Sequence, residues 1–184
     1  PVFSEEGQLL AWVSRDPQFE AKEQAFLALP PEQRSKETKP AKHRFPSGFQ
    51  RGLELFGQAS VRLKEPGYRE AIARHGIVVV EGFNDVIALD SLGVPAVAIM
   101  SNKLTDEQAA KIDRWARTLS DGKVSLLFDA DDAGDAGAKE ALWLLSQRNL
   151  QVRLLWSRQM HAGAYANRQP ESLTRAELSA LRGA

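Results

Sequence analysis

The pattern of apolar and polar positions changes at residue 76. Beyond it, apolar runs without polar alternation occupy residues 77–80, 96–99, 124–128 and 152–156. Segments with helical apolar spacing separate these runs. Strands that lack polar alternation and are separated by helices are typical of a parallel sheet covered on both faces. The sequence therefore predicts an α/β fold, with a parallel sheet flanked by helices on both faces.

Helices are expected between these strands, at residues 84–92, 105–119 and 135–148. Thr105 suits the start of its helix because a glutamine stands three residues later, as in a capping box. A last short helix is expected at residues 174–181. The alternation of strands and helices is what a parallel sheet requires, because each crossover between parallel strands needs a long connection.

The segment before residue 76 predicts a small N-terminal α+β subdomain. Residues 2–3 and 9–13 flank a glycine turn and predict a hairpin, and residues 19–29 predict a short helix ended by two prolines. Residues 32–42 are polar and charged, which favours an exposed loop. We expect three parts: the N-terminal part at residues 1–75, a sheet domain at 76–160 and a C-terminal extension at 161–184.

Composition excludes several classes of protein. The 184 residues contain 24 basic and 24 acidic side chains, so the net charge indicates no particular partner. Cysteine is absent, which excludes disulfides and Cys-ligated zinc and is compatible with a reducing cytoplasm. No apolar run approaches the roughly 20 residues of a membrane helix, and no signal peptide is visible. The chain begins with Pro1, so we expect a fragment of a longer protein.

Acidic side chains follow two of the predicted strands. Glu81 comes directly after residues 77–80, and Asp129 comes directly after residues 124–128. The carboxyl ends of parallel strands meet at one edge of a sheet. If the two strands are neighbours, we expect Glu81 and Asp129 to lie roughly 5–10 Å apart. Asp85 and Asp131 follow within a few residues and add to the same acidic cluster.

This cluster predicts a metal site. Carboxylates packed so closely repel one another unless protons or cations neutralise them. Oxygen ligands without a nearby His or Cys favour Mg²⁺ or Mn²⁺ over zinc, and such sites commonly act on phosphate. Each element also has a simpler interpretation, because a single Asp-x-Asp is often a turn or helix cap. Two strands that each end in an acid, followed by a second acid and a glycine, favour the metal site.

The spacing of these residues resembles the Toprim signature. Glu81-Gly82 followed by Asp85, and Asp129-x-Asp131 followed by Gly134, are similar to the two motifs of that domain. Toprim domains occur in primases, topoisomerases, OLD-type nucleases and RecR-type repair proteins. The resemblance covers residues 76–156 and implies that all four acids bind metal: Glu81, Asp85, Asp129 and Asp131.

A longer resemblance connects the chain with bacterial DnaG-type primases. It rests on VVVEGFNDVIALDSLGVPAVA, LLFDADDAGDAGAKEAL, KHRFPSGFQRGLELFG and VFSEEGQLLAWVSRD, and runs from near residue 1 to about residue 175. It implies the catalytic core of a primase, a nucleotidyltransferase of DNA replication that makes RNA primers on single-stranded DNA from nucleoside triphosphates. A replicative helicase would be a further partner, through a domain outside this chain. The resemblance also implies a cytoplasmic protein of bacterial or mobile-element origin, and no membrane is expected.

The resemblance also implies roles for individual residues. Glu81, Asp129 and Asp131 would be catalytic. Basic residues would contact the template or the nucleotide, and they are Lys42, Arg44, Arg51 and Lys103. Cations interleaved with aromatic rings suit a single strand of nucleic acid. A solvated basic loop beside buried aromatic residues explains the same pattern, and both interpretations stay open.

One segment departs from the primase pattern. Primases carry a third acidic segment that ends in Asp-Pro-Asp, where this chain has Gln169-Pro170-Glu171. Glu171 retains one acid and Gln169 replaces the other. Two alternatives to a primase therefore stay open: an OLD-like Toprim nuclease, and a non-catalytic nucleic-acid-binding accessory module of a mobile element.

Overall fold

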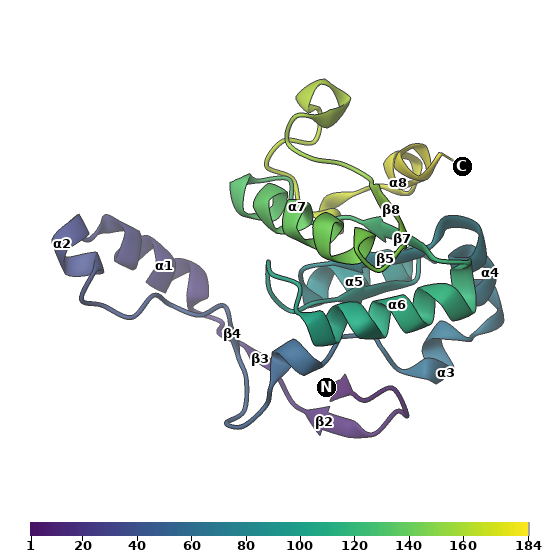
Figure 1. The fold of residues 1–184 in the computed structure, drawn as a ribbon. Coiled ribbons are helices and arrows are strands. Elements are labelled where there is room, and N and C mark those ends of the chain that lie inside the picture. The colour runs from purple at the N-terminus through teal and green to yellow at the C-terminus, as the bar shows by residue number, and fades with distance from the viewer. Residues whose placement is uncertain (184) are drawn as a thin grey trace. The chain divides into compact units, whose positions relative to one another are not determined.

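The computed structural model describes residues 1–183, which form two compact units (Figure 1). The first unit contains Pro1–Val2 and Leu9–Phe49, and the second contains Phe3–Gln8 and the chain from Gln50 onward. These units are defined by contacts within the structure, whereas the boundaries expected at residues 75 and 160 follow changes in the sequence pattern. Those boundaries stay a prediction. None of the helices in residues 1–183 combines the length and the apolar character needed to cross a membrane.

The N-terminal elements are short. In chain order they are β1 (Val2–Phe3), β2 (Leu9–Ala11), β3 (Ser14–Arg15), α1 (Phe19–Ala28), α2 (Pro31–Arg34) and β4 (His43–Arg44). β1 pairs with β2, and Gly7 between them has a φ of 84°, so the predicted hairpin with its glycine turn is confirmed. The loop predicted at residues 32–42 is wrong at its start, because Pro31 is preorganised for a first helical turn and begins α2.

Asp16 organises the first unit. Its buried carboxylate accepts hydrogen bonds from the Lys22 ammonium at 2.6 Å, the Gln18 backbone N–H at 2.9 Å and the Arg44 guanidinium at 3.0 Å. The Asp16 N–H donates to the Lys42 carbonyl at 3.0 Å, beside the antiparallel pairing of β3 with β4. The bond from Lys22 is the largest of the interactions that lower the pKa of Asp16 to about 2. A single carboxylate thus links α1 with β4.

The second unit contains the predicted sheet domain. Its elements are η1 (Arg51–Leu53), α3 (Ser60–Leu63), α4 (Pro66–His75), β5 (Ile77–Val80), α5 (Phe83–Ser91), β6 (Ala96–Ala98), α6 (Asp106–Ser120), β7 (Lys123–Leu126), α7 (Asp132–Ser146), β8 (Gln151–Leu154), η2 (Met160–Gly163), η3 (Pro170–Ser172) and α8 (Arg175–Arg182). All four predicted strands are present, and the capping box at Thr105 is confirmed. The helix expected at residue 135 begins earlier, at Asp132, because the Asp131 side chain caps it.

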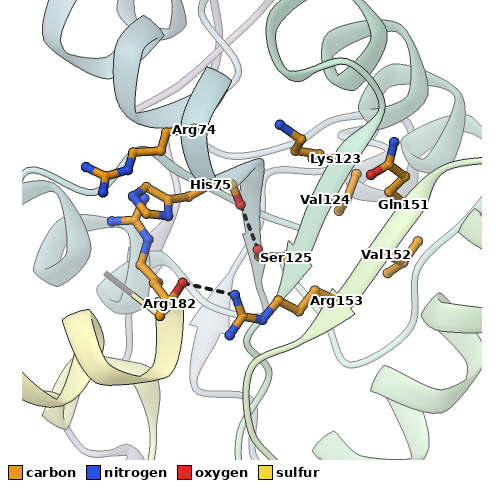
Figure 2. Close-up of a pocket in the computed structure, with 10 residues that line it drawn as sticks. Arg74, His75, Lys123, Val124, Ser125, Gln151, Val152, Arg153 and Arg182 are labelled. Atoms are coloured by element: carbon orange, nitrogen blue, oxygen red, sulfur yellow. Dashed lines mark hydrogen bonds between the residues drawn. The ribbon is translucent and has the colours of Figure 1, made fainter.

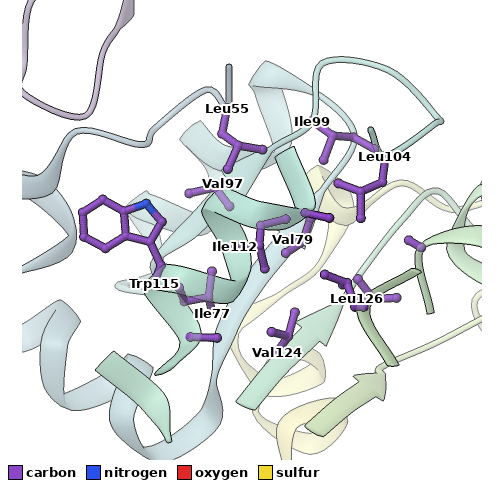
Figure 3. Close-up of a cluster of buried hydrophobic side chains, with 14 of the residues drawn as sticks. Leu55, Ile77, Val79, Val97, Ile99, Leu104, Ile112, Trp115, Val124 and Leu126 are labelled. Carbon is purple, nitrogen blue, oxygen red and sulfur yellow. The ribbon is translucent and has the colours of Figure 1, made fainter. Parts of the chain in front are cut away.

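The sheet is parallel, with strand order β6-β5-β7-β8. In β5, Ile77 and Val79 pack in a cluster with residues of α6 and α7, as Figure 3 shows around Ile112. Val78 and Val80 pack on the opposite face with residues of α5 and α8. Since every β5 side chain enters one of the two cores, the strand shows no polar alternation. The α/β fold with a helix-covered parallel sheet is confirmed.

The network around Asp16 predicts how acid affects the first unit. A carboxylate whose pKa is lower in the folded than in the unfolded chain stabilises the fold above its unfolded pKa, near 4. That stabilisation disappears as the pH falls towards the folded pKa of about 2. Asp16→Asn should therefore lower the urea midpoint at pH 7, and the difference from the original chain should shrink steadily between pH 4 and pH 2. Circular dichroism follows the unfolding.

Glu32→Gln provides the control for Asp16→Asn. Glu32 is an exposed acid in the first turn of α2, in the same unit. Its substitution should leave the midpoint within experimental error at every pH. A deficit of Asp16→Asn that stays constant down to pH 2 would contradict an electrostatic origin.

Candidate metal centre

Neighbouring strands bring the first two acids together. β5 pairs with β7, with Val79 opposite Leu126, and the Leu127 N–H continues the ladder by donating to the Val79 carbonyl at 2.9 Å. Just beyond the strands, Glu81 Oε1 accepts a hydrogen bond from the Asp129 backbone N–H at 3.0 Å. The expectation that the two strands are neighbours is confirmed. Glu81 and Asp129 lie side by side at the carboxyl edge of the sheet.

Asp85 is the most deeply buried of these acids, with 4% of its surface exposed. It occupies the first turn of α5 and accepts a hydrogen bond from the Gly82 N–H at 2.9 Å. Gly82 has no side chain with which to cap the helix, so Asp85 satisfies one of the backbone groups at the helix start. Its other oxygen accepts from the Glu171 N–H at 3.3 Å. Asp85 therefore joins α5 to the segment that contains η3.

Asp131 caps the start of α7, and a glycine in the first turn lets this helix approach Glu81 and Asp129. The Asp131 side chain accepts from the Gly134 N–H at 2.8 Å. A Cβ atom on Gly134 would overlap the Asp129 carbonyl and would lie 2.9 Å from Glu81 Oε1. A Cβ atom on Gly137, one turn later, would overlap the Asn102 carbonyl. The two glycines let α7 pack closely against the loops that follow β7 and β6.

Burial and mutual repulsion make the cluster hold protons. Burial, followed by the Asp129 carboxylate, raises the pKa of Glu81 to about 8. Burial also raises the pKa of Asp85 to about 7, against the lowering effect of the Gly82 N–H and with further raising by Asp129 and Glu171. A cation bound beside these carboxyl groups would counter the repulsion between them. An all-oxygen cluster with this property suits a hard divalent cation.

The donors do not form a closed cage. In residues 1–183, no three His, Cys, Asp or Glu side chains are arranged to hold a metal ion together. Asp85 is already engaged by two backbone N–H groups, whereas Glu81, Asp129 and Asp131 are half-buried. Mg²⁺ typically takes one or two carboxylates and keeps several waters. The residues therefore fit a hydrated cation on an open site.

The altered third segment reaches the acids. The backbone of Ala130 exchanges hydrogen bonds with Arg168 at 2.9 Å and Asn167 at 2.6 Å, which holds this segment beside the end of β7. The Gln169 amide then donates to the Asp129 carboxylate at 3.4 Å. The sequence shows only that Gln169 stands where primases carry an aspartate. In the structure it places a neutral donor against Asp129, a contact that no local pattern indicates.

The predicted basic residues lie in different places. Arg51 in η1 donates to the Met100 carbonyl at 3.5 Å, past the carboxyl end of β6 and thus at the same sheet edge as the acids. Lys103 is exposed and forms a 3.8 Å ion pair with Glu140 of α7. Lys42 and Arg44 belong to the first unit, where Arg44 pairs with Asp16. The second unit therefore brings together the four acids and places Arg51 at their edge of the sheet.

Comparison with known families identifies the sheet domain. Residues 78–163 match the family described as Toprim-like, and this stretch includes Glu81, Asp85, Asp129 and Asp131. These residues form a Toprim domain. The same stretch contains β5 to β8 and their connecting helices, so the family match and the acidic sheet edge coincide.

The Toprim domain and its flanking segments are similar to bacterial DNA primases. The chain is 33% identical over 107 residues to the DNA primase of Aquifex aeolicus, which covers 56% of this chain and 19% of that protein. It is 35% identical over 113 residues to the DNA primase of Synechococcus elongatus, which covers 58% of this chain and 15% of that protein. The matched stretch thus spans less than a fifth of the length of each of these relatives.

A solved structure extends the similarity over most of the chain. A DNA primase domain from Pseudomonas aeruginosa superposes with a TM-score of 0.62 and 26% sequence identity. The match covers 96% of this chain and 46% of that one. The Toprim domain here therefore has the fold of a DnaG-type primase, as the sequence motifs predicted.

The close approach of α7 predicts a strong effect of Gly134→Ala. The added methyl group would overlap the Asp129 carbonyl, so the start of α7 would have to move away from Glu81 and Asp129. Overpacking of this kind typically costs about 1–3 kcal/mol of unfolding free energy. Urea unfolding measures the loss.

Gly67→Ala is the matched control for Gly134→Ala. Gly67 also lies in the first turn of a helix, α4, but its Cβ would meet only the Glu65 carboxylate, at 3.4 Å. This variant should be neutral or more stable by up to about 1 kcal/mol, because alanine has the higher helix propensity. Equal stability changes in the two variants would contradict the packing of α7.

Proposed function

We propose that this chain is part of the catalytic core of a DNA primase and performs metal-dependent nucleotidyl transfer. The observation that carries the proposal is the cluster of four acids within the segment that matches the Toprim family. The structural similarity to a DNA primase domain covers 96% of the chain and so extends on both sides of this segment, which supports a polymerising role. The product would be an RNA primer made on single-stranded DNA from nucleoside triphosphates.

The metal would be Mg²⁺ or Mn²⁺, with Glu81, Asp129 and Asp131 as its candidate ligands. One or two of these carboxylates would contact the ion, and the others would act through its bound waters. When bound, such a cation activates an attacking 3′-hydroxyl and stabilises the charge of the leaving pyrophosphate. Asp85 would support the site from its buried position, because its oxygens already accept two backbone hydrogen bonds. The Gln169 amide would orient the Asp129 carboxylate without adding a negative charge.

Glu81 has a second property that suits nucleotidyl transfer. Its carboxyl group has a pKa of about 8, so it can hold or accept a proton near neutral pH. The Asp129 N–H bonded to Oε1 fixes the orientation of the carboxyl group. Catalytic roles for Glu81, Asp129 and Asp131 are part of the proposal.

Basic residues would bind the phosphates of the template and the nucleotide. Arg51 is the strongest candidate, because it lies at the same sheet edge as the acids. Lys42, Arg44 and Lys103 would add charge that attracts a nucleic-acid strand in a salt-dependent manner. The proposal also includes a replicative helicase as partner and a cytoplasmic location. Both rest on the resemblance to primases alone.

Asp129→Asn tests the catalytic role. The change removes one charge and preserves the shape of the side chain, so it should lower template-dependent extension by about 100-fold or more, as expected for the loss of a group that acts on the transition state. Extension is measured with single-stranded DNA, labelled nucleotides and Mg²⁺ or Mn²⁺. Electron paramagnetic resonance of Mn²⁺ measures the accompanying loss of metal affinity.

Asp132→Asn is the control for Asp129→Asn. Asp132 is an adjacent exposed acid that pairs with Arg158. Its substitution should leave extension within about twofold, because exposed ion pairs contribute little. Shortening of the DNA in place of extension would support the nuclease alternative. Unchanged metal binding by Asp129→Asn would contradict the site itself and favour the non-catalytic accessory module, which the replacement of an acid by Gln169 also suits.

The raised pKa values predict that metal binding releases protons. Without metal, Glu81 and Asp85 are partly protonated between pH 6 and 8, because their pKa values are about 8 and about 7. A cation binds the deprotonated groups, so its affinity should rise with pH and level off above about pH 8. Calorimetry of Mg²⁺ binding in buffers of different ionisation enthalpy counts the protons released.

Glu81→Gln separates the contribution of Glu81 from that of Asp85. In this variant the proton release near pH 8 should disappear, and only the smaller release near pH 7 from Asp85 should remain. Metal binding by the original chain at pH 7.5 without any proton release would contradict the raised pKa values.

A further inference from the structure

A second cluster of charge lies at the opposite edge of the sheet. A cavity of about 420 Å³ opens there, between the amino ends of the strands and the last turn of α8. Lys123 and Gln151 begin β7 and β8, His75 ends α4 just before β5, and Arg182 ends α8 (Figure 2). Glu81 lies six positions after His75 in the sequence, which corresponds to about 20 Å along a strand. The cavity is therefore separate from the acidic cluster.

The lining of this cavity carries positive charge only. Its charged members are Arg74, Lys123, Arg153 and Arg182, and no Asp or Glu is among the lining residues. Val124 and Val152 add an apolar strip to the wall. A concave site with several convergent cations and an apolar strip has the composition of a small-molecule site rather than of an ordinary solvated surface.

Part of this charge has an internal explanation. The Arg153 guanidinium donates to the carbonyls of Arg182 at 2.9 Å and Leu181 at 2.8 Å, at the end of α8. The Lys123 ammonium donates to the Ala73 carbonyl at 3.4 Å, near the end of α4. Cations at helix C-termini compensate the unpaired carbonyls there. Arg153 and Lys123 therefore stabilise the fold whether or not the cavity holds a ligand.

Arg182 has no such explanation. Its Nε and Nη2 atoms are buried and have no hydrogen-bond partner in the described chain. Its side chain lies beside the His75 imidazole in Figure 2, and the neighbouring charge that acts on it is another cation, Arg74. Burial, followed by Arg74, lowers the pKa of Arg182. A guanidinium whose Nε and Nη2 atoms are buried without acceptors is costly unless an anion accepts their hydrogen bonds.

We propose that this cavity binds a small anion that carries two or more phosphate groups, of the size of a nucleotide. Arginine forks match phosphate oxygens in geometry as well as in charge, and Arg74 and Arg182 approach the cavity from different helices. The volume of about 420 Å³ lies in the range of small-molecule sites and exceeds the need of a single ion. This site needs no metal and is independent of the acidic cluster.

Titration in metal-free buffer with inorganic pyrophosphate and with ADP tests the proposal. Without a cation, the acidic cluster repels both probes, so it does not compete for them. Nuclear magnetic resonance should show shifts of the backbone amides at residues 123–125 and 151–153. Arg74→Gln and Arg182→Gln should each weaken binding by about tenfold, the effect of losing one charge-assisted pair of hydrogen bonds.

Arg69→Gln is the matched control. Arg69 is exposed on the same helix as Arg74, and the variant loses the same charge outside the cavity, so binding should change less than twofold. Because Arg74 is also exposed, its variant is informative even if Arg182→Gln fails to fold.

Three results would overturn the proposal. The first is no shift at millimolar pyrophosphate or ADP. The second is equal weakening by Arg69→Gln and Arg74→Gln, which would mean non-specific attraction. The third is that a single-stranded oligonucleotide without terminal phosphate shifts these amides while pyrophosphate does not, which would assign the surface to nucleic acid.

Discussion

The parallel pairing of β5 with β7 is the constraint on which both candidate sites depend. It directs both carboxyl ends to one edge of the sheet, so Glu81 and Asp129 meet there. The same pairing places Lys123 and the end of α4 at the other edge. In a parallel sheet all the carboxyl ends lie at one edge and all the amino ends at the other. In this chain the acidic cluster lies at the carboxyl edge, and the basic side chains of the cavity lie at the amino edge. A shift of one residue in register would move Glu81 away from the Asp129 N–H and exchange the faces of every β5 side chain.

Hydrogen-bond donors, most of them backbone N–H groups, partly compensate the negative charge of the acidic edge. Three of the four acids accept hydrogen bonds from backbone N–H groups: Glu81 from that of Asp129, Asp131 from that of Gly134, and Asp85 from those of Gly82 and Glu171. The Asp129 carboxylate accepts from the Gln169 side-chain amide. The backbone bonds oppose the effect of burial on the pKa values of Glu81 and Asp85, but do not cancel it. The fold therefore keeps part of the electrostatic repulsion that a bound cation can relieve. Strain of this kind is typical of sites that are organised for binding at some cost in stability.

Much of the fold and of the acidic site could be predicted because the signals are local. The β5 sequence is fully apolar, and Thr105 with Gln108 forms a recognisable capping box. The helix start predicted at residue 135 is three residues late, because the side chain of Asp131, which the motif assigns to the site, also caps α7. In α2, a single turn begins at Pro31 inside a polar stretch that has no apolar period.

Glu81 and Asp129 could be expected to meet because each follows a parallel strand, but other contacts between distant segments could not be predicted. Gln169 and Asp129 are 40 residues apart, and their meeting depends on the backbone bonds around Ala130. The basic cavity combines residues from α4, β7, β8 and α8, none of which forms a motif with the others. Such features follow from the packing of whole elements, for which a single sequence carries no periodic or spacing signal.

The hydrogen bond that the Glu171 N–H donates to Asp85 connects the Toprim sheet to the segment that follows it. The segment after β8 contributes Leu173, Leu178 and Leu181 to the core on the α5 face of the sheet. A protein cut at residue 160 would expose that face to water and leave one Asp85 oxygen without its donor. The Toprim sheet in this chain is therefore not a transplantable unit by itself. Anyone who grafts or truncates it must carry the last helix along.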